Sequence, residues 1–234
     1  MKLFIIISIF TASLFSQEIF GVVSKVKGEA YETTKEKKTI LLIVGDKVSI
    51  DSTVFTKEKS RIIIKFEKDI IALNQNSKLF LNEKNIVTQE SGSVFYNIDP
   101  VQSFTKVLNK LSPKQFKIKT KTSIIGIRGT DFIVDANTKQ KIFLRNGRLN
   151  ITSVEQEFKI YEKKQLDEFS TYKQKLHKEF DKFIKTQEYE FSEYKKEFIL
   201  EANNYVYIKD GKVYQEQFSK EVSLMFDEID IFTQ

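Results

Sequence analysis

The sequence predicts a mainly β N-terminal domain, of sandwich, roll or β-helical type, followed by a long α-helix and a small C-terminal α/β tail. Three observations lead to this fold class. Between residues 19 and 154, short β-branched and apolar runs alternate with turn residues, as in all-β domains. From residue 157, an eleven-residue unit that opens with Glu-Phe repeats four times, which indicates a helix. Near the C-terminus, Asp210-Gly211 lies between two short apolar runs and predicts a hairpin.

Residues 1–16 have the three parts of a secretory signal peptide. Lys2 gives a positive start, the run from Leu3 to Phe15 is almost wholly apolar, and small residues precede an expected cleavage after Ser16. The apolar run is shorter than the about 20 residues of a membrane-spanning helix, although an uncleaved anchor is the alternative. We therefore expect a periplasmic or secreted protein with no membrane span in its mature chain. Because the chain has no cysteine, its core must be stable without disulfides.

The predicted β-domain covers residues 17–155. Its expected strands lie at 19–26, 39–44, 47–55, 61–67, 70–73, 78–81, 93–98, 115–122, 132–135, 142–144 and 149–151. Residues 101–111 break the series, because their apolar residues have helical spacing. Asn146-Gly147 separates the last two runs and predicts a tight hairpin there.

A long helical segment is expected over residues 156–202, most clearly over 165–202. Eleven residues are close to three helical turns, so one face carries an aromatic and apolar stripe. The stripe consists of Phe169, Tyr172, Leu176, Phe180, Phe183, Phe191, Tyr194 and Phe198. It is expected to pack on the chain's own domain or tail, or to form a homo-oligomer as a coiled coil. The first block has a second interpretation, since Phe158 and Ile160 alternate like residues of a last β-strand.

Residues 203–234 are expected to form a short hairpin and a helix. The hairpin would join 205–208 to 212–214. Phe218, Val222, Phe226 and Ile229 then have helical spacing.

Positive charge is concentrated in the first half of the chain. Residues 17–154 carry 24 Lys and Arg against 14 Asp and Glu, and no acidic residue occurs between Pro100 and Thr130. Lys117, Lys119 and Lys121 would share one face of a strand, with Lys114 just before it. These four lysines are the candidate surface for an anionic partner, a solvated face being the alternative. Secretion disfavours nucleic acid, so an envelope protein or an anionic glycan is the expected partner.

Enzyme chemistry is not expected. The single histidine, His177, has no cysteine or carboxylate cluster beside it that would complete a metal site. The Ser-x-x-Lys spacing of some serine nucleophiles occurs at Ser24, Ser170 and Ser192, but neither of its companion motifs is present. Gly126-Ile127-Arg128-Gly129 lacks the glycine spacing and the lysine of a phosphate-binding loop. No catalytic, metal or cofactor site is therefore assigned.

Four stretches of the β-half carry a resemblance to a known family. The most specific runs from Phe116-Lys117-Ile118-Lys119-Thr120 to Ile127-Arg128-Gly129-Thr130-Asp131-Phe132. The others are Gly21–Val23 with Val26–Ala30, Gly45–Val48 with Thr53–Thr56 and Ser60, and Glu90–Val94. These stretches resemble the FecR family of periplasmic domains, and the first is similar to the family's "f-x-v-x-T … v-R-G-T-x-F" signature. Together they cover residues 19–155.

The resemblance implies a periplasmic, mostly β module that acts by protein contact. The sequence lacks the anti-sigma segment and central membrane helix of signalling members, so regulation of a sigma factor is not carried over. Within the signature, Arg128, Gly129, Thr130 and Phe132 are expected to be structural, with Gly129 permitting a tight bend. The expected function is an envelope interaction or sensor module, and the alternative is a coiled-coil scaffold or spacer.

Overall fold

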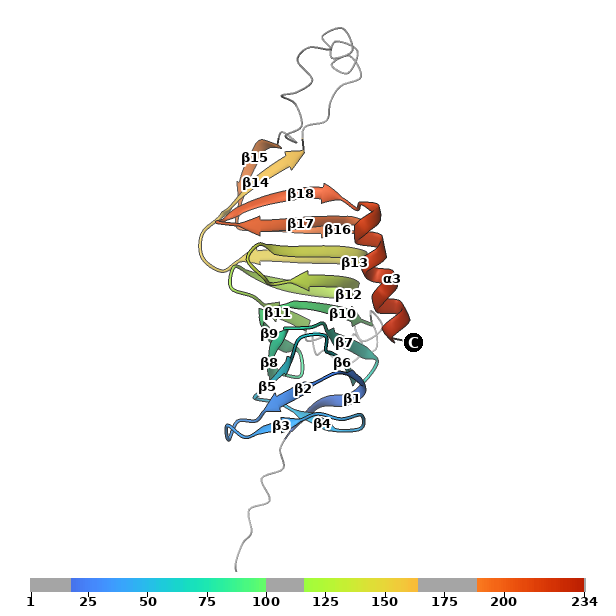
Figure 1. The fold of residues 1–234 in the computed structure, drawn as a ribbon. Coiled ribbons are helices and arrows are strands. Elements are labelled where there is room, and N and C mark those ends of the chain that lie inside the picture. Colours follow the sequence, from blue (N-terminus) through green and yellow to red (C-terminus); the bar gives the residue numbers. More distant parts are fainter. Residues whose placement is uncertain (1–17, 100–115, 164–188, 234) are drawn as a thin grey trace, which may run out of the picture.

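The computed structural model describes residues 18–99, 116–163 and 189–233, which form eighteen strands and one helix, α3 (Lys220–Thr233) (Figure 1). The first ten strands are β1 (Ile19–Lys27), β2 (Ala30–Thr33), β3 (Thr39–Leu41), β4 (Lys47–Ser49), β5 (Ser52–Thr56), β6 (Arg61–Phe66), β7 (Asp69–Leu73), β8 (Lys78–Glu83), β9 (Ile86–Ser91) and β10 (Ser93–Ile98). The others are β11 (Phe116–Lys119), β12 (Ser123–Asp135), β13 (Gln140–Ser153), β14 (Phe158–Lys163), β15 (Tyr189–Lys195), β16 (Glu197–Glu201), β17 (Asn204–Lys209) and β18 (Lys212–Gln217).

All strands belong to one mixed sheet that is folded into two facing layers. Layer 1 has the pairing order β4-β1-β6-β7-β10-β12-β13-β17-β18-β14-β15. Layer 2 has the order β3-β2-β5-β8-β9-β11-β12-β13-β16. The long strands β12 and β13 run through both layers and join them. Among the described strands, only the β9–β11 and β14–β18 pairs are parallel.

The chain passes between the layers at corners, and many of these corners contain a residue with positive φ. The corners at Gly45, Gly28, Lys59, Asn76 and Gly92 follow one edge of the stack, which we call the corner edge. Those at Gly129, Gly147 and Asn203 follow the opposite edge. Glycine adopts this backbone conformation without steric cost, and asparagine tolerates it.

The corner at Gly147 corrects one prediction. Asn146-Gly147 was expected to close a hairpin between two strands, but both flanking runs belong to β13, which bends there from layer 1 into layer 2. Gly147 does have positive φ, at 89°. Its Cα lies so close to the next corner that an added Cβ would come within 2.3 Å of the Gly129 carbonyl oxygen. Asn146-Gly147 therefore does form a backbone turn, but this turn carries β13 from one layer to the other and does not connect two strands.

The main core lies between the two layers. Alternate residues of each strand point inward, as expected for a two-layer sheet. Fully buried members include Ile64, Leu73 and Phe132 from layer 1 and Leu81 and Ile118 from layer 2. A second core lies on the outer face of layer 1, where Val222, Phe226 and Ile229 of α3 cover strands from β6 to β13.

The predicted long repeat helix is wrong for the part that the structure describes. Residues 189–201 form strands β15 and β16, and β14 confirms the alternative interpretation of the first block as a strand. Residues 164–188 lie outside the described residues, as do residues 101–111, where a second helical pattern was noted. The three-residue aromatic spacing is helical, but the pairing of β16 with β13, which buries Leu200, overrides it and decides for strand.

The predicted C-terminal hairpin and helix are present as β17, β18 and α3, but they do not form a separate tail. Strand β17 pairs with β13, and β18 pairs with β14, so the hairpin continues layer 1. Within the described ranges, no helix is both long and apolar enough to cross a membrane.

Candidate functional site

The candidate site is an open groove of about 940 Å³ beside the corner edge, a volume within the usual range of ligand sites. Four consecutive corners and one hairpin form its floor, and the last turns of α3 form a wall. The lining residues are Lys27, Lys59, Ser60, Arg61, Asn74, Gln75, Asn76, Gly92, Ser93, Asn137, Glu228 and Ile231. The groove is thus built almost entirely from polar and basic side chains.

Hydrogen bonds between neighbouring corners fix the floor. The Ser60 hydroxyl accepts from the Glu29 amide at 2.8 Å, and the Ser77 hydroxyl donates to the Ser93 carbonyl at 3.0 Å. The Lys59 amide donates to the side-chain oxygen of Gln75 at 3.0 Å. These contacts link one corner to the next, so the groove is preformed.

Several groups in the groove are left for a ligand. Within the described part of the chain, the side-chain amides of Asn74, Asn76 and Asn137 make no hydrogen bond, and the ammonium groups of Lys27 and Lys59 make no ion pair. Arg61 contacts Glu228 of α3 at 3.4 Å, an exposed and weak ion pair. The site therefore offers both donors and acceptors for hydroxyl groups together with at least two cations.

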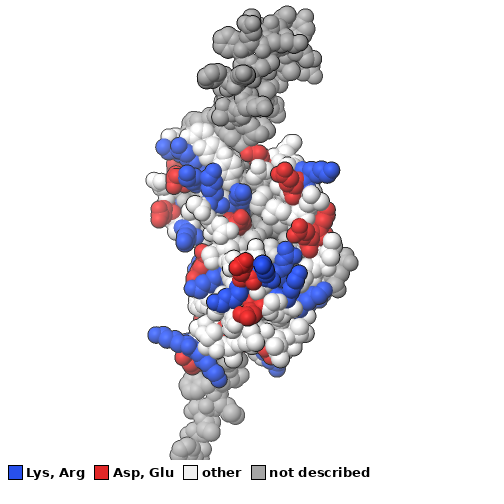
Figure 2. All heavy atoms as spheres, viewed as in Figure 1, with Lys and Arg blue, Asp and Glu red and all other residues white. Residues whose placement is uncertain are grey.

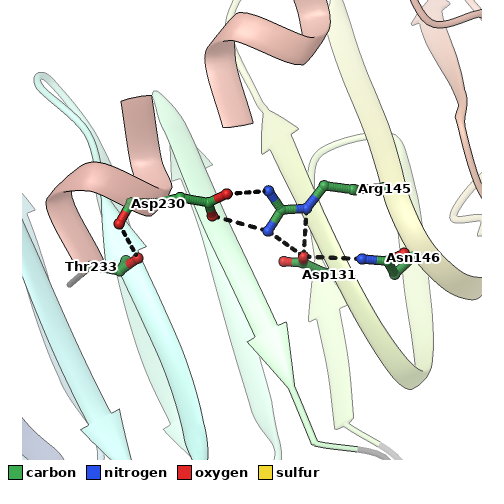
Figure 3. A network of polar contacts seen from close by, with 5 residues as sticks. All are labelled: Asp131, Arg145, Asn146, Asp230 and Thr233. Carbon is green, nitrogen blue, oxygen red and sulfur yellow. Dashed lines mark hydrogen bonds and ion pairs between the residues drawn. The ribbon is translucent and has the colours of Figure 1, made fainter. Parts of the chain in front are cut away.

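The α3 wall is held in place by Arg145 of β13 (Figure 3). Its guanidinium donates to Asp230 of α3 through Nη1 at 2.7 Å and Nη2 at 3.0 Å, and to Asp131 of β12 through Nε at 2.6 Å. It also stacks 4.8 Å from the centre of the Phe226 ring. One cation thus ties the sheet to the helix that carries Glu228 and Ile231.

Burial raises the pKa of Asp131 above its usual value, and the adjacent Arg145 guanidinium only partly offsets this. The Asn146 amide donates a long bond, 3.4 Å, to the same carboxylate oxygen that binds Arg145. The other oxygen, Oδ1, is buried without a hydrogen-bond partner. The Arg145 guanidinium is therefore the main group that favours the ionised form of Asp131.

Sequence comparison finds no match to any protein-family model or curated protein. In fold, the chain is similar to two crystal structures, at 1.65 and 2.50 Å resolution, described as a "putative anti-sigma factor" from Parabacteroides distasonis. The TM-score is 0.44 in both cases, with 11% and 12% sequence identity and 72% of this chain covered. The likeness spans 61% of those chains and concerns the backbone fold alone.

The signature around Arg128 lies at a corner and not in the groove. Gly129 forms the corner with a φ of 60°, Thr130 is buried, and the Phe132 ring stacks on Tyr96 at 5.2 Å in the main core. The side chain of Arg128 is not among those that the structure describes. Asp131, within the same signature, reaches the groove wall indirectly through Arg145.

The lysine surface lies on the outer face of layer 2, away from the groove. Phe116 and Ile118 point into the core, while Lys117 and Lys119 are exposed on β11 and Lys121 is exposed just after it. The residues beside Lys117 and Lys119 on neighbouring strands are all uncharged: Ile86, Thr88, Ile124 and Gly126. Lys114 lies outside the described residues.

The described residues of the predicted aromatic stripe do not lie on one helix face, because they belong to strands. Phe169, Tyr172, Leu176, Phe180 and Phe183 lie outside the described residues. Phe191 is in β15, but the structure does not describe its side chain. Tyr194 is exposed on β15, and Phe198 on β16 packs edge-on against Phe158 with ring centres 5.7 Å apart.

The groove was missed at the sequence level, although one signal was available. In the sequence, Asn74-Gln75-Asn76 separates the expected strands at 70–73 and 78–81, and consecutive amides at a turn are also able to bind a ligand. Arg145 and Asp230 are 85 residues apart, and their contact has no local sequence signal. Across the described ranges, no three acidic or histidine side chains gather as a metal-binding group.

Proposed function

We propose that this protein is a non-enzymatic binding module of the bacterial cell envelope, acting outside the cytoplasm, and that the groove binds an anionic glycan. The observation that carries the proposal is the combination, in one preformed groove, of unpaired amides with Lys27 and Lys59. Amide groups both donate to and accept from sugar hydroxyls. Ammonium groups bind carboxylate or sulfate substituents through charge-assisted hydrogen bonds.

The location outside the cytoplasm is supported by the signal-peptide pattern of residues 1–16. A non-catalytic role is supported by the composition of the groove. Its lining offers amide, hydroxyl and cationic groups, and its one acid, Glu228, is exposed and contacts Arg61. Such groups recognise a ligand, whereas general acid–base catalysis needs a group with a pKa near the working pH.

Binding of polygalacturonate, a carboxylated polysaccharide, tests the proposal by calorimetry at 0.15 M salt. The double variant Lys27→Gln/Lys59→Gln should weaken binding about tenfold or more, since each lost charge-assisted bond contributes about 1.5–3 kcal/mol before screening. Asn76→Ala or Asn137→Ala should each weaken it severalfold. Neutral dextran should bind far more weakly than polygalacturonate.

The matched control is Lys117→Gln/Lys119→Gln, which removes the same charge from the lysine surface and leaves the groove intact. It should bind polygalacturonate like the unchanged protein. Equal loss in both double variants would show that only the overall charge attracts the polymer. Loss confined to the control would place the anionic partner on the lysine surface instead. Either result would overturn the groove as the binding site.

A further inference from the structure

Exposed apolar side chains are concentrated at one end of the stack. Of the twelve large hydrophobic residues that are exposed among the described residues, six lie between positions 19 and 44. Four of them, Ile40, Leu41, Ile43 and Val44, lie on or just after β3 and are 40–61% exposed. We call these four residues the apolar tip. A soluble surface seldom concentrates this much apolar area without a partner.

The apolar tip belongs to the last pair of strands at this end. Strand β3 is outermost in layer 2 and β4 is outermost in layer 1, as the lower end of the stack in Figure 1 shows. Only Leu42, between the exposed residues, points inward and is buried. Terminal repeats of stacked proteins usually present a polar outer face, and this one does not.

A further β-strand is a poor candidate for covering the tip, because side chains already satisfy backbone groups there. The Asp46 carboxylate accepts from the Ile43 amide at 2.8 Å, and the Glu32 carboxylate accepts from the Ser49 amide at 2.7 Å. The Ser52 hydroxyl donates to the Ser49 carbonyl at 2.7 Å. Such capping is a way in which proteins block the addition of strands to an edge. The capped groups at Ile43 and Ser49 therefore disfavour a further strand beside this part of the edge.

Lysines outnumber acids in the segment that carries the tip. Residues 35–47 contain four lysines and two acids, Glu36 and Asp46, and Figure 2 shows both kinds of charge at the lower end of the stack. Lys37, Lys38 and Lys47 are exposed and form no ion pair with a described residue, whereas Lys35 pairs with Asp51 at 2.9 Å. Exposed aliphatic groups beside unpaired lysines match the interface of an anionic bilayer, where apolar groups enter the acyl boundary and cations meet the headgroups. A second copy of the chain would bring these lysines against one another.

The described chain also begins at this end. The Ile50 amide, just after β4, donates to the Glu18 carbonyl at 2.8 Å. The apolar run from Leu3 to Phe15 therefore joins the fold at the same pair of strands.

We propose that the apolar tip docks on an anionic lipid bilayer, with Leu41, Ile43 and Val44 entering the interface. This surface is distinct from the groove and does not depend on the groove's ligand. Docking through the tip would hold the stack with its layers projecting away from the membrane.

A single introduced cysteine tests the docking, since the natural chain has none. Val44→Cys is labelled with an environment-sensitive dye, and its emission is followed with phosphatidylglycerol vesicles and with phosphatidylcholine vesicles. The expected result is a shift to shorter wavelength with phosphatidylglycerol and a much smaller one with phosphatidylcholine. A dye at Lys209→Cys, on the turn of the β17–β18 hairpin, is the control and should not respond.

The triple variant Leu41→Asn/Ile43→Asn/Val44→Asn should lower the vesicle-bound fraction about tenfold in sedimentation, whereas Ile199→Asn on exposed β16 should not. Every variant keeps the same N-terminus, which mass spectrometry verifies, so a retained leader affects all of them equally. A concentration-dependent shift without vesicles would mean that a second copy covers the tip. That result, or no shift with either lipid, would overturn the proposal.

Discussion

Arg145 of β13 binds Asp230 of α3 through two parallel hydrogen bonds, 2.7 and 3.0 Å long, across 85 residues of sequence. The same guanidinium neutralises the buried Asp131. Helix α3 therefore depends mainly on Arg145 for its polar attachment to the sheet, with the exposed Arg61–Glu228 pair beside it. Its apolar attachment depends on Val222, Phe226 and Ile229.

Replacing this cation should cost more than replacing its exposed partner. Arg145→Met leaves the Asp131 carboxylate buried without a counter-ion, and should lower the free energy of unfolding by about 3 kcal/mol. Asp230→Asn should cost about 1 kcal/mol, because the Asp230 side chain is 40% exposed. Urea unfolding measures both values. Glu228→Gln, which removes only an exposed ion pair, serves as the control and should change little. A smaller loss for Arg145→Met than for Asp230→Asn would contradict this assignment.

Alanine at two corner glycines separates backbone strain from close packing. Gly45 and Gly147 both have positive φ, at 95° and 89°. No atom lies within 4 Å of a Cβ at Gly45, so Gly45→Ala should cost only about 1 kcal/mol. At Gly147 the Cβ would also collide with the backbone of Gly129, so Gly147→Ala should cost about 3 kcal/mol or more. Equal losses in urea unfolding would show that the layers do not approach closely there.

Stability should depend on pH through Asp69. Burial raises the pKa of Asp69 to about 6, from an ordinary value of 3.8, although the Asp99 amide donates a 2.8 Å bond to its carboxylate. The folded state thus holds this proton more tightly than the unfolded state does. Its contribution to stability is present at low pH and is lost as pH rises from about 4 to about 6.

Asp69→Asn should therefore stabilise the fold at pH 7.5 by about 1–2 kcal/mol, since the amide oxygen keeps the bond to Asp99 without a buried charge. At pH 4 the gain should nearly vanish. Thermal unfolding at the two pH values measures the difference. An unchanged gain at both values would mean that the Asp69 carboxyl titrates normally.

The attachment of α3 should depend on one aromatic side chain. Phe226 is buried and lies between Phe95 of the sheet and Phe218, with ring centres at 6.3 and 5.7 Å. Phe226→Ala should lower the free energy of unfolding by about 3 kcal/mol, whereas alanine at the neighbouring, exposed Met225 should cost less than about 1 kcal/mol. Hydrogen exchange should show faster exchange in α3 for the first variant only. If both variants behave alike, α3 does not pack through this face.

The sequence predicts individual elements better than it predicts their assembly. The β-rich first half, the Asp210-Gly211 hairpin and the final helix follow from local turn residues and periodicity, and the structure has all three. The long helix fails because tertiary pairing overrides the helical spacing of the aromatic residues: β15 pairs with β14, and β16 pairs with β13. Tertiary contacts also decide the role of Asn146-Gly147. The local sequence cannot distinguish a hairpin between two strands from a bend within one strand that crosses from layer to layer.

The groove could not be predicted for a related reason. Its members come from four corners, a hairpin and α3, and each alone resembles an ordinary turn or helix end. Lys117 and Lys119 were found because they alternate along a single strand, which is a local pattern. Lys27, Lys59 and Asn137 share no pattern until the layers have folded.

The corners also determine where the chain should begin to unfold. Each pair of strands on either side of a corner contacts mainly the pairs next to it, so stability is close to a sum of nearest-neighbour terms. Strands at the two ends, such as β3 and β15, have a neighbour on one side only. Opening should therefore begin as fraying from the ends and spread inward, leaving the β10–β12–β13 centre protected longest.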